Sequence, residues 1–273
     1  IVTVPTVSAD ILDGNIGYLR ITQFTQSTAQ QTRKELLIFL EEGVKGIVLD
    51  LRDNPGGIVD TTLSVADMFL SDETIVHIRG KHADHDQTLR SSKETLVPTE
   101  MPLVTLVNKG SASASEILAG ALQDNNRSPL IGSQTFGKGL IQIVSPFGDG
   151  YYTLTTSQYK TPSGAEIHTV GIPVDIEVDD IYIDEDEMEA YQEFTNSGVV
   201  EEFVAQHPGF SFENVQLFLD TVVGEDPPFD EEVYKILVRR EYLNEIPYEE
   251  RPIADVEFDP VLKRAIIFIN EGS

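Results

Sequence analysis

Residues 46–70 read GIVLDLRDNPGGIVDTTLSVADMFL, and this stretch decides the fold class. Its first six residues, GIVLDL, are a nearly continuous apolar run with the length of a buried strand. RDNPGG follows with the residue types of a turn, and residues 61–70 carry apolar side chains at helical spacing. The stretch therefore predicts a buried strand, a turn and a helix in succession.

The flanking segments repeat this alternation. IGYLRI, residues 16–21, predicts a strand, and residues 25–27 can cap a helix for which Gly43 supplies a stop. Further predicted elements are strands over residues 74–78, 102–107, 140–144 and 151–156, a helix over about residues 113–123, and a long polar surface loop over residues 82–98. Short strands alternating with helices favour an α/β layer architecture.

Composition excludes several classes of protein. With 273 residues, of which 40% are hydrophobic, the chain can form one large or two modest domains. A net charge of -27 excludes nucleic-acid binding, which needs clustered Lys and Arg. The absence of cysteine excludes disulfides, thiolate metal sites and a cysteine nucleophile. No segment approaches the roughly 20 apolar residues of a membrane span, so no span is expected in this chain.

The N-terminus lacks the basic and apolar regions of a signal peptide, and it begins at Ile1. We therefore expect a processed form or an excised piece of a longer protein.

The acidic residues concentrate in the C-terminal third. From Asp175 to the end the chain has 27 acidic and 6 basic residues. We place a domain boundary near residue 180, with an α/β core over residues 1–180 and a smaller, acidic, mainly helical region over residues 181–273. Apolar stripes in this region leave two interpretations open, packing on the core or assembly with a second copy. The stripes comprise Phe203, Val215, Leu217, Phe218, Leu219, Val233, Ile236 and Leu237.

NKGSASASEILAGALQDNNR, residues 108–127, puts Ser113 at the start of a predicted helix. Free N–H groups and the positive end of the helix dipole at such a position stabilise a developing oxyanion. The structural alternative is a simple capping box between Ser113 and Glu116.

GSQTFGKGLIQIV, residues 132–144, sets Lys138 between two glycines before a predicted strand. A lysine that is uncharged near the working pH can act as a general base, and burial in an apolar pocket lowers its pKa. Gln142 would share a strand face with Lys138 and hold its amine. The structural alternative is a solvated loop lysine.

DLRDNPGG, residues 50–57, ends in Gly56 and Gly57, whose N–H groups could face a substrate oxygen; by itself it is only a turn. None of the five histidines has a context that indicates a Ser-His protease. The loop HADHD (His82, Asp84, His85, Asp86) could be a metal site, but two histidines in a polar loop without a third placed ligand are more often solvated. We therefore expect no metal and no cofactor.

Together the segments DLRDNPGG, SASASE, FGKGLIQ and YKTPSG resemble, in this order, the pattern of the carboxyl-terminal processing proteases, also called tail-specific proteases. The resemblance spans residues 4–178. It implies a crotonase-like α/β protease core and a serine endopeptidase that acts on protein or peptide substrates near their C-termini.

By position, the resemblance makes Ser113 the nucleophile, Lys138 the general base and Gln142 its supporting residue. It assigns the oxyanion hole to the N–H groups of Gly57 and Ala114, leaving Ser111 and Ser115 as structural neighbours. It also implies a secreted, periplasmic or lumenal location.

Two departures accompany the resemblance. The family's G-[IV]-x-P-D segment reads GIPVD here, at residues 171–175. The PDZ domain that most members carry has no counterpart in this chain, which begins where such a domain would end. A crotonase-type acyl-CoA enzyme would not require this lysine and glutamine, and a catalytically silent peptide-binding or scaffold protein of the same fold is the leading alternative.

Overall fold

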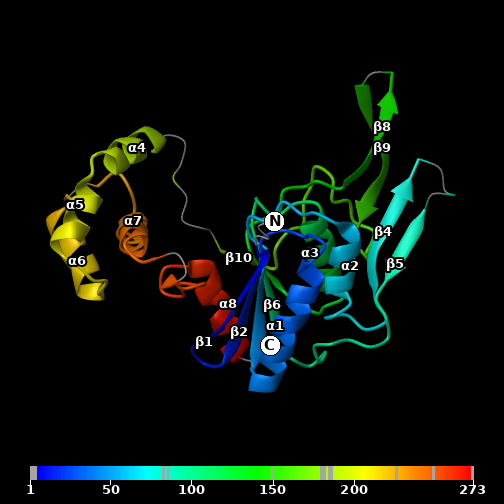
Figure 1. The fold of residues 1–273 in the computed structure, drawn as a ribbon, viewed down its shortest axis with the longest axis horizontal. Helices are drawn as coiled ribbons and strands as arrows, with labels where there is room; N and C mark the ends of the chain where they lie inside the picture. The colour runs from blue at the N-terminus through cyan, green and yellow to red at the C-terminus, as the bar shows by residue number, and fades with distance from the viewer. Residues whose placement is uncertain are drawn as a thin grey trace. The chain divides into compact units, whose positions relative to one another are not determined.

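The computed structural model describes residues 5–81, 84, 86–148, 150–178, 183, 187–224, 227–247 and 250–271. The chain divides into two compact units (Figure 1). The first comprises Ile1–Val178 with Val261–Ser273, and the second comprises Asp179–Pro260. This division differs from the sequence expectation at the C-terminus, where the last helix joins the first unit.

A six-stranded sheet forms the centre of the first unit, in the order β1-β2-β3-β6-β7-β10. The strands are β1 (Val7–Leu12), β2 (Ile16–Ile21), β3 (Gly46–Asp50), β6 (Leu103–Val107), β7 (Leu130–Gly132) and β10 (Ile176–Glu177). β1 is antiparallel to β2, and the other neighbours are parallel. The predicted α/β architecture is confirmed. The sequence did not indicate β1, β7 or β10, of which the last two have only three and two residues.

Helices cover both faces of this sheet. They are α1 (Thr28–Glu42), α2 (Val59–Ala66), α3 (Ala114–Asp124) and α8 (Pro260–Glu271). A Cβ on Gly17 of β2 would touch Phe39 of α1, whereas a Cβ on Gly46 of β3 would touch Ile269 of α8. Gly17 pairs with Ile47, the residue after Gly46, so the two glycines point to opposite faces. The main core lies on the α1 side.

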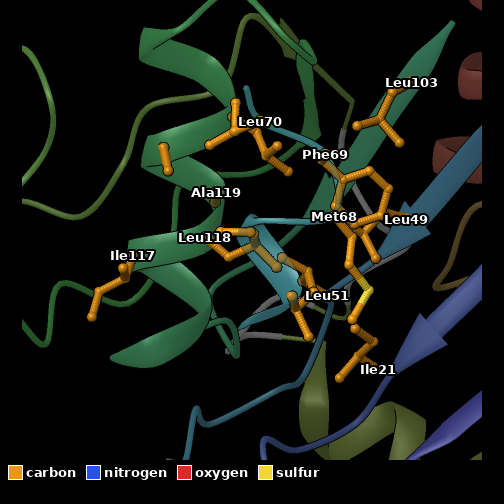
Figure 2. Packing of buried hydrophobic residues seen from close by; sticks show 14 of the residues in the cluster. Ile21, Leu49, Leu51, Met68, Phe69, Leu70, Leu103, Ile117, Leu118 and Ala119 are labelled. Carbon is orange, nitrogen blue, oxygen red and sulfur yellow. The ribbon is translucent and has the colours of Figure 1, made fainter. Parts of the chain in front are cut away.

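The main hydrophobic core joins α3 to β3 and to the chain after α2. Figure 2 shows Leu118 of α3 in one cluster with Leu51 and with Met68 and Phe69. The predicted helix over residues 61–70 begins earlier, at Val59, and ends at Ala66. Met68 and Phe69 then continue in tight turns whose N–H groups bond three residues back, which keeps both side chains in the core.

A smaller antiparallel sheet has the order β5-β4-β9-β8. Its strands are β4 (Thr74–Gly80), β5 (Gln87–Arg90), β8 (Leu140–Phe147) and β9 (Gly150–Lys160). The hairpin β8–β9 extends away from the six-stranded sheet (Figure 1). The prediction of a loop without regular structure over residues 82–98 is wrong at β5, because pairing with β4 supplies backbone hydrogen bonds that a polar local sequence does not indicate. His82 and His85 lie outside the described residues.

The second unit contains α4 (Met188–Asn196), α5 (Val199–Gln206), α6 (Phe212–Thr221) and α7 (Glu231–Asn244), which share their own hydrophobic cluster. Most of the predicted apolar stripes are buried in this cluster, including Phe203, Phe218 and Leu237. Leu217 remains exposed. Assembly with a second copy stays a prediction.

No helix in the described part of the chain has the length and apolar character needed to cross a bilayer.

Candidate active site

Asn54 fastens the DLRDNPGG turn to both sides of Ser113. Its buried amide donates to the Ile21 carbonyl at 2.8 Å and its side-chain oxygen accepts the Gly56 N–H at 2.9 Å. Its backbone carbonyl accepts the Ala112 N–H and the Ser115 hydroxyl, each at 2.9 Å. The turn after β3 and the start of α3 are therefore held as one structure.

Ser113 lies at the N-cap of α3 with a backbone that is uncommon for serine. Its φ is 56° and its ψ is -112°. A non-glycine residue at such angles costs about 1–3 kcal/mol, and residues of this kind cluster at functional sites. The side chain is partly exposed. The structure thus presents a hydroxyl at a helix N-terminus at an energetic cost.

The other two serines of SASAS are buried and bonded to the main chain. The Ser111 hydroxyl donates to the Leu51 carbonyl at 2.8 Å, and the Ser115 hydroxyl donates to Asn54 as described. Both are fully buried, so only Ser113 of the three reaches solvent.

The two glycines of the turn lie against neighbouring segments, Gly56 against Ser113 and Ala114 and Gly57 against Phe24. A Cβ added to Gly56 would be 2.9 Å from both the Ser113 Cβ and the Ala114 nitrogen. Gly57 has a φ of 144°, and a Cβ there would be 2.1 Å from the Phe24 carbonyl oxygen. Glycine is therefore required at both positions. Among the described residues, the N–H groups of Gly57, which is exposed, and of Ala114, which is buried, have no hydrogen-bond acceptor.

Glu116 joins the serine segment to the lysine segment. Its fully buried carboxylate accepts the Ser113 N–H and the Lys138 N–H on the same oxygen, Oε2, each at 2.8 Å. The other oxygen, Oε1, accepts the Gly137 N–H at 2.6 Å and the Thr135 hydroxyl at 2.7 Å. Of these four bonds, the sequence predicted only the one from the Ser113 N–H, which is half of the capping box.

The Lys138 backbone is thus held close to Ser113, but its side chain is exposed. Its amine donates no hydrogen bond to Ser113 or to any other residue in the described part of the chain. Gln142 does not hold that amine either, because its exposed side chain donates to the Thr155 hydroxyl at 3.3 Å. The structure brings together Ser113, Ala114, Gly57 and the Lys138 main chain, but not the Lys138 amine or Gln142.

A buried network of charged and polar side chains lies at the start of the DLRDNPGG turn. Asp50 at the end of β3 accepts hydrogen bonds from Tyr18 at 2.7 Å and from the Arg52 guanidinium at 2.7 Å. Burial opposes the charge of Asp50, but Arg52, with Arg20 and Tyr18, holds its pKa below the usual value. Burial, followed by the neighbouring Asp50, raises the pKa of Tyr18 well above its ordinary range.

Two groups of functional interest were missed in the sequence. Asp50 is the last residue of the apolar strand β3, and Arg52 follows two residues later. Two opposite charges at the end of a buried strand could have indicated the buried ion pair that the structure contains. Glu116 gave no such signal beyond the capping box, because its contacts to Thr135, Gly137 and Lys138 are long-range.

The second unit has a separate cavity of about 270 Å³, lined by residues of α5 and α6 and of the segments that follow them. None of the predicted site residues lies in it.

The segment that makes these contacts matches a known protein family. The sequence pattern of peptidase family S41 matches residues 15–178, which include every residue of the candidate site. The chain belongs to peptidase family S41. The predicted resemblance to carboxyl-terminal processing proteases is thereby confirmed.

Among curated relatives, a carboxy-terminal-processing protease of Bartonella bacilliformis is 46% identical over 173 residues, covering 62% of this chain and 40% of the relative. A carboxyl-terminal-processing protease of a Synechocystis species is 41% identical over 162 residues, covering 59% of this chain and 37% of that protein. The chain thus spans about two fifths of the length of these relatives.

Solved structures agree on the fold. The photosystem II D1 C-terminal processing protease superposes with a TM-score of 0.59 at 33% identity, covering 65% of this chain and 49% of that one. A putative S41 protease from Bacteroides fragilis has a TM-score of 0.52 at 19% identity, covering 68% of this chain and 52% of that one, a similarity that concerns the fold alone.

Proposed function

We propose that this S41 chain contains the catalytic machinery of a serine endopeptidase, with Ser113 as nucleophile and Lys138 as general base. The single observation that carries the proposal is the shared Glu116 oxygen, which accepts the backbone N–H groups of both residues at 2.8 Å. The two nitrogens are therefore at most twice 2.8 Å apart. A lysine side chain consists of five bonds of about 1.5 Å and spans about 6 Å. A side chain of this length is long enough for the Lys138 amine to reach the Ser113 hydroxyl.

In the proposed reaction the uncharged Lys138 amine takes the proton of the Ser113 hydroxyl as Oγ attacks the scissile carbonyl carbon. The N–H groups of Gly57 and Ala114 donate to the resulting oxyanion. The lysine ammonium then protonates the leaving amine, and the C–N bond breaks to leave an acyl-enzyme. A water molecule, deprotonated by Lys138, hydrolyses the ester and returns Ser113 to its starting form.

Gln142 is proposed to hold the Lys138 amine once it has turned inward. The two residues are four positions apart, and in an extended chain side chains at even spacing share a face. The bond from Gln142 to Thr155 is 3.3 Å long and exposed, so exchanging it for the lysine costs little.

Cleavage near protein C-termini and action outside the cytoplasm are proposals that rest on the relatives. Several are named carboxyl-terminal processing proteases, and two of them are named as chloroplastic. The substrates would be proteins or peptides.

The test is cleavage of casein by the chain and by Ser113→Ala and Lys138→Ala variants. Loss of cleavage in both, with retention in a Lys93→Ala variant of another exposed lysine, supports the dyad. Cleavage that persists in both variants contradicts it. A wild-type chain that binds casein but never cleaves it identifies instead the catalytically silent peptide-binding protein, the alternative favoured by the outward Lys138 side chain.

A further inference from the structure

The outer edge of β8 is open. β8 (Leu140–Phe147) pairs with β9 on one side and, within the described residues, with no strand on the other. An unpaired strand edge presents N–H and C=O groups that can pair with another extended chain. β8 thus offers a template for one more strand.

The pairing with β9 identifies which residues face outward. The Tyr159 N–H donates to the Gly139 carbonyl at 2.7 Å, and the Thr156 hydroxyl donates to the Ile141 carbonyl at 3.5 Å. Residues 139 and 141 therefore direct their backbone groups to β9. The register shift between Ile141 and Gln142 places the extra residue, Thr156, on β9, so the directions still alternate along β8, and Leu140 and Gln142 direct theirs to the open edge.

The position of Pro146 is consistent with this assignment. Pro146 lies an even number of residues after Leu140, so an N–H at this position would point to the open edge. Proline has no N–H, and here no hydrogen bond to β9 is lost. The open edge therefore offers donors from Leu140 up to, but not including, Pro146.

The open edge leads to the candidate nucleophile. Lys138 lies two residues before Leu140 and has the same parity. Its N–H donates to Glu116 Oε2, the oxygen that also accepts the Ser113 N–H. A chain paired with Leu140 on this side would continue toward Ser113 within about two residues, or about 7 Å.

The composition of β8 is suited to a peptide partner. Its sequence LIQIVSPF has no charged residue in a chain of net charge -27. Charged side chains on an edge strand commonly prevent pairing with other chains, and β8 has none of them.

We propose that an extended segment of the polypeptide substrate adds to the open edge of β8 as a further strand, from Leu140 toward Pro146, and thereby brings its scissile bond to Ser113. The description of this segment as substrate rests on the proposed function. Recognition through backbone hydrogen bonds tolerates many side chains but requires an unfolded segment, and it disfavours proline at alternate substrate positions.

The first test measures binding without catalysis. A fluorescein-labelled, uncharged peptide of eight residues, the length of β8, is titrated into the Ser113→Ala variant, with one peptide N–H methylated at a time. We expect affinity to fall about tenfold at every second position, as for loss of one hydrogen bond, and little at the positions between. Equal losses at all positions, or no binding of the unmethylated peptide, would overturn the proposal.

The second test changes the strand. Leu140→Pro in the Ser113→Ala background removes one outward N–H, and Leu140→Ala shortens the same side chain while keeping that N–H. We expect the proline variant to bind the peptide about tenfold more weakly than the alanine variant, and equal affinities would overturn the proposal. Circular dichroism establishes whether the proline variant is folded, and if it is not, the methylation series decides.

Cleavage by the wild-type chain separates this proposal from the function on which it rests. If the methylation pattern has a period of two and the wild-type chain leaves the peptide intact, the catalytic proposal fails and the strand-addition proposal stands as a peptide-binding surface.

Discussion

The Glu116 carboxylate accepts the Lys138 backbone N–H at 2.8 Å, across 22 residues of sequence. The same oxygen accepts the Ser113 N–H, so a fully buried acidic side chain sets the separation of the two proposed catalytic segments. Four donors compensate its desolvation, and three of them are backbone N–H groups.

Glu116→Gln tests this connection. The amide replaces one acceptor oxygen by an NH₂ group, which leaves buried N–H donors without an acceptor at about 1–3 kcal/mol each. We expect the free energy of unfolding in urea to fall by about 2–4 kcal/mol, and kcat for a peptide to fall by at least about tenfold under conditions where the variant is folded. Wild-type values for both quantities would show that the shared oxygen has no such role.

Gly57→Ala tests the close approach of the turn to Phe24. A Cβ at this position would be 2.1 Å from the Phe24 carbonyl oxygen, and the φ of 144° is itself unfavourable for alanine. We expect a loss of at least about 3 kcal/mol in the free energy of unfolding. Gly164→Ala is the matched control, since its φ is 89° and a Cβ there would meet no atom within 4 Å. Urea unfolding that ranks the two variants equally would contradict the packing argument.

The lowered pKa of Asp50 predicts that the folded chain loses stability in acid. Its pKa is lower in the folded chain than its usual value of 3.8, so its stabilising contribution is complete above that pH and is lost as the pH falls below 3.8 toward the folded pKa. Asp50→Asn removes the buried negative charge that faces the Arg52 guanidinium, and we expect it to cost about 3–5 kcal/mol. Denaturant unfolding from pH 7 to pH 3 measures both effects. The variant should have a weaker dependence on pH in the acid range than the wild-type chain, and an identical dependence would count against the pair.

The proposed lysine base predicts the pH dependence of cleavage. Because only the uncharged amine accepts the serine proton, kcat/KM should rise with pH from about 6 to about 9. Initial rates with a short fluorogenic peptide measure this profile, with the Ser113→Ala variant as the blank. A profile that falls over this range would argue against Lys138 as the base.

The helix over residues 113–123 and the strands at residues 16–21, 46–51 and 102–107 could be predicted, because their apolar patterns are local and complete. β5, β7 and β10 could not, since each is short and depends on a distant partner for its backbone hydrogen bonds. The same reason explains why α8 was assigned to the acidic region. Its buried face, including Ile269, finds its partner at Gly46, more than two hundred residues earlier.

The motifs SASASE, FGKG and DLRDNPGG by themselves determined the family, and they located the proposed nucleophilic hydroxyl and the two glycines, because each motif is a short run of adjacent residues. Only the tertiary structure decided that Glu116 accepts backbone N–H groups from both proposed catalytic segments, that Asp50 and Arg52 form a buried pair, and that the Lys138 side chain is exposed. These features depend on contacts between segments distant in sequence and on side-chain rotamers, and local pattern specifies neither.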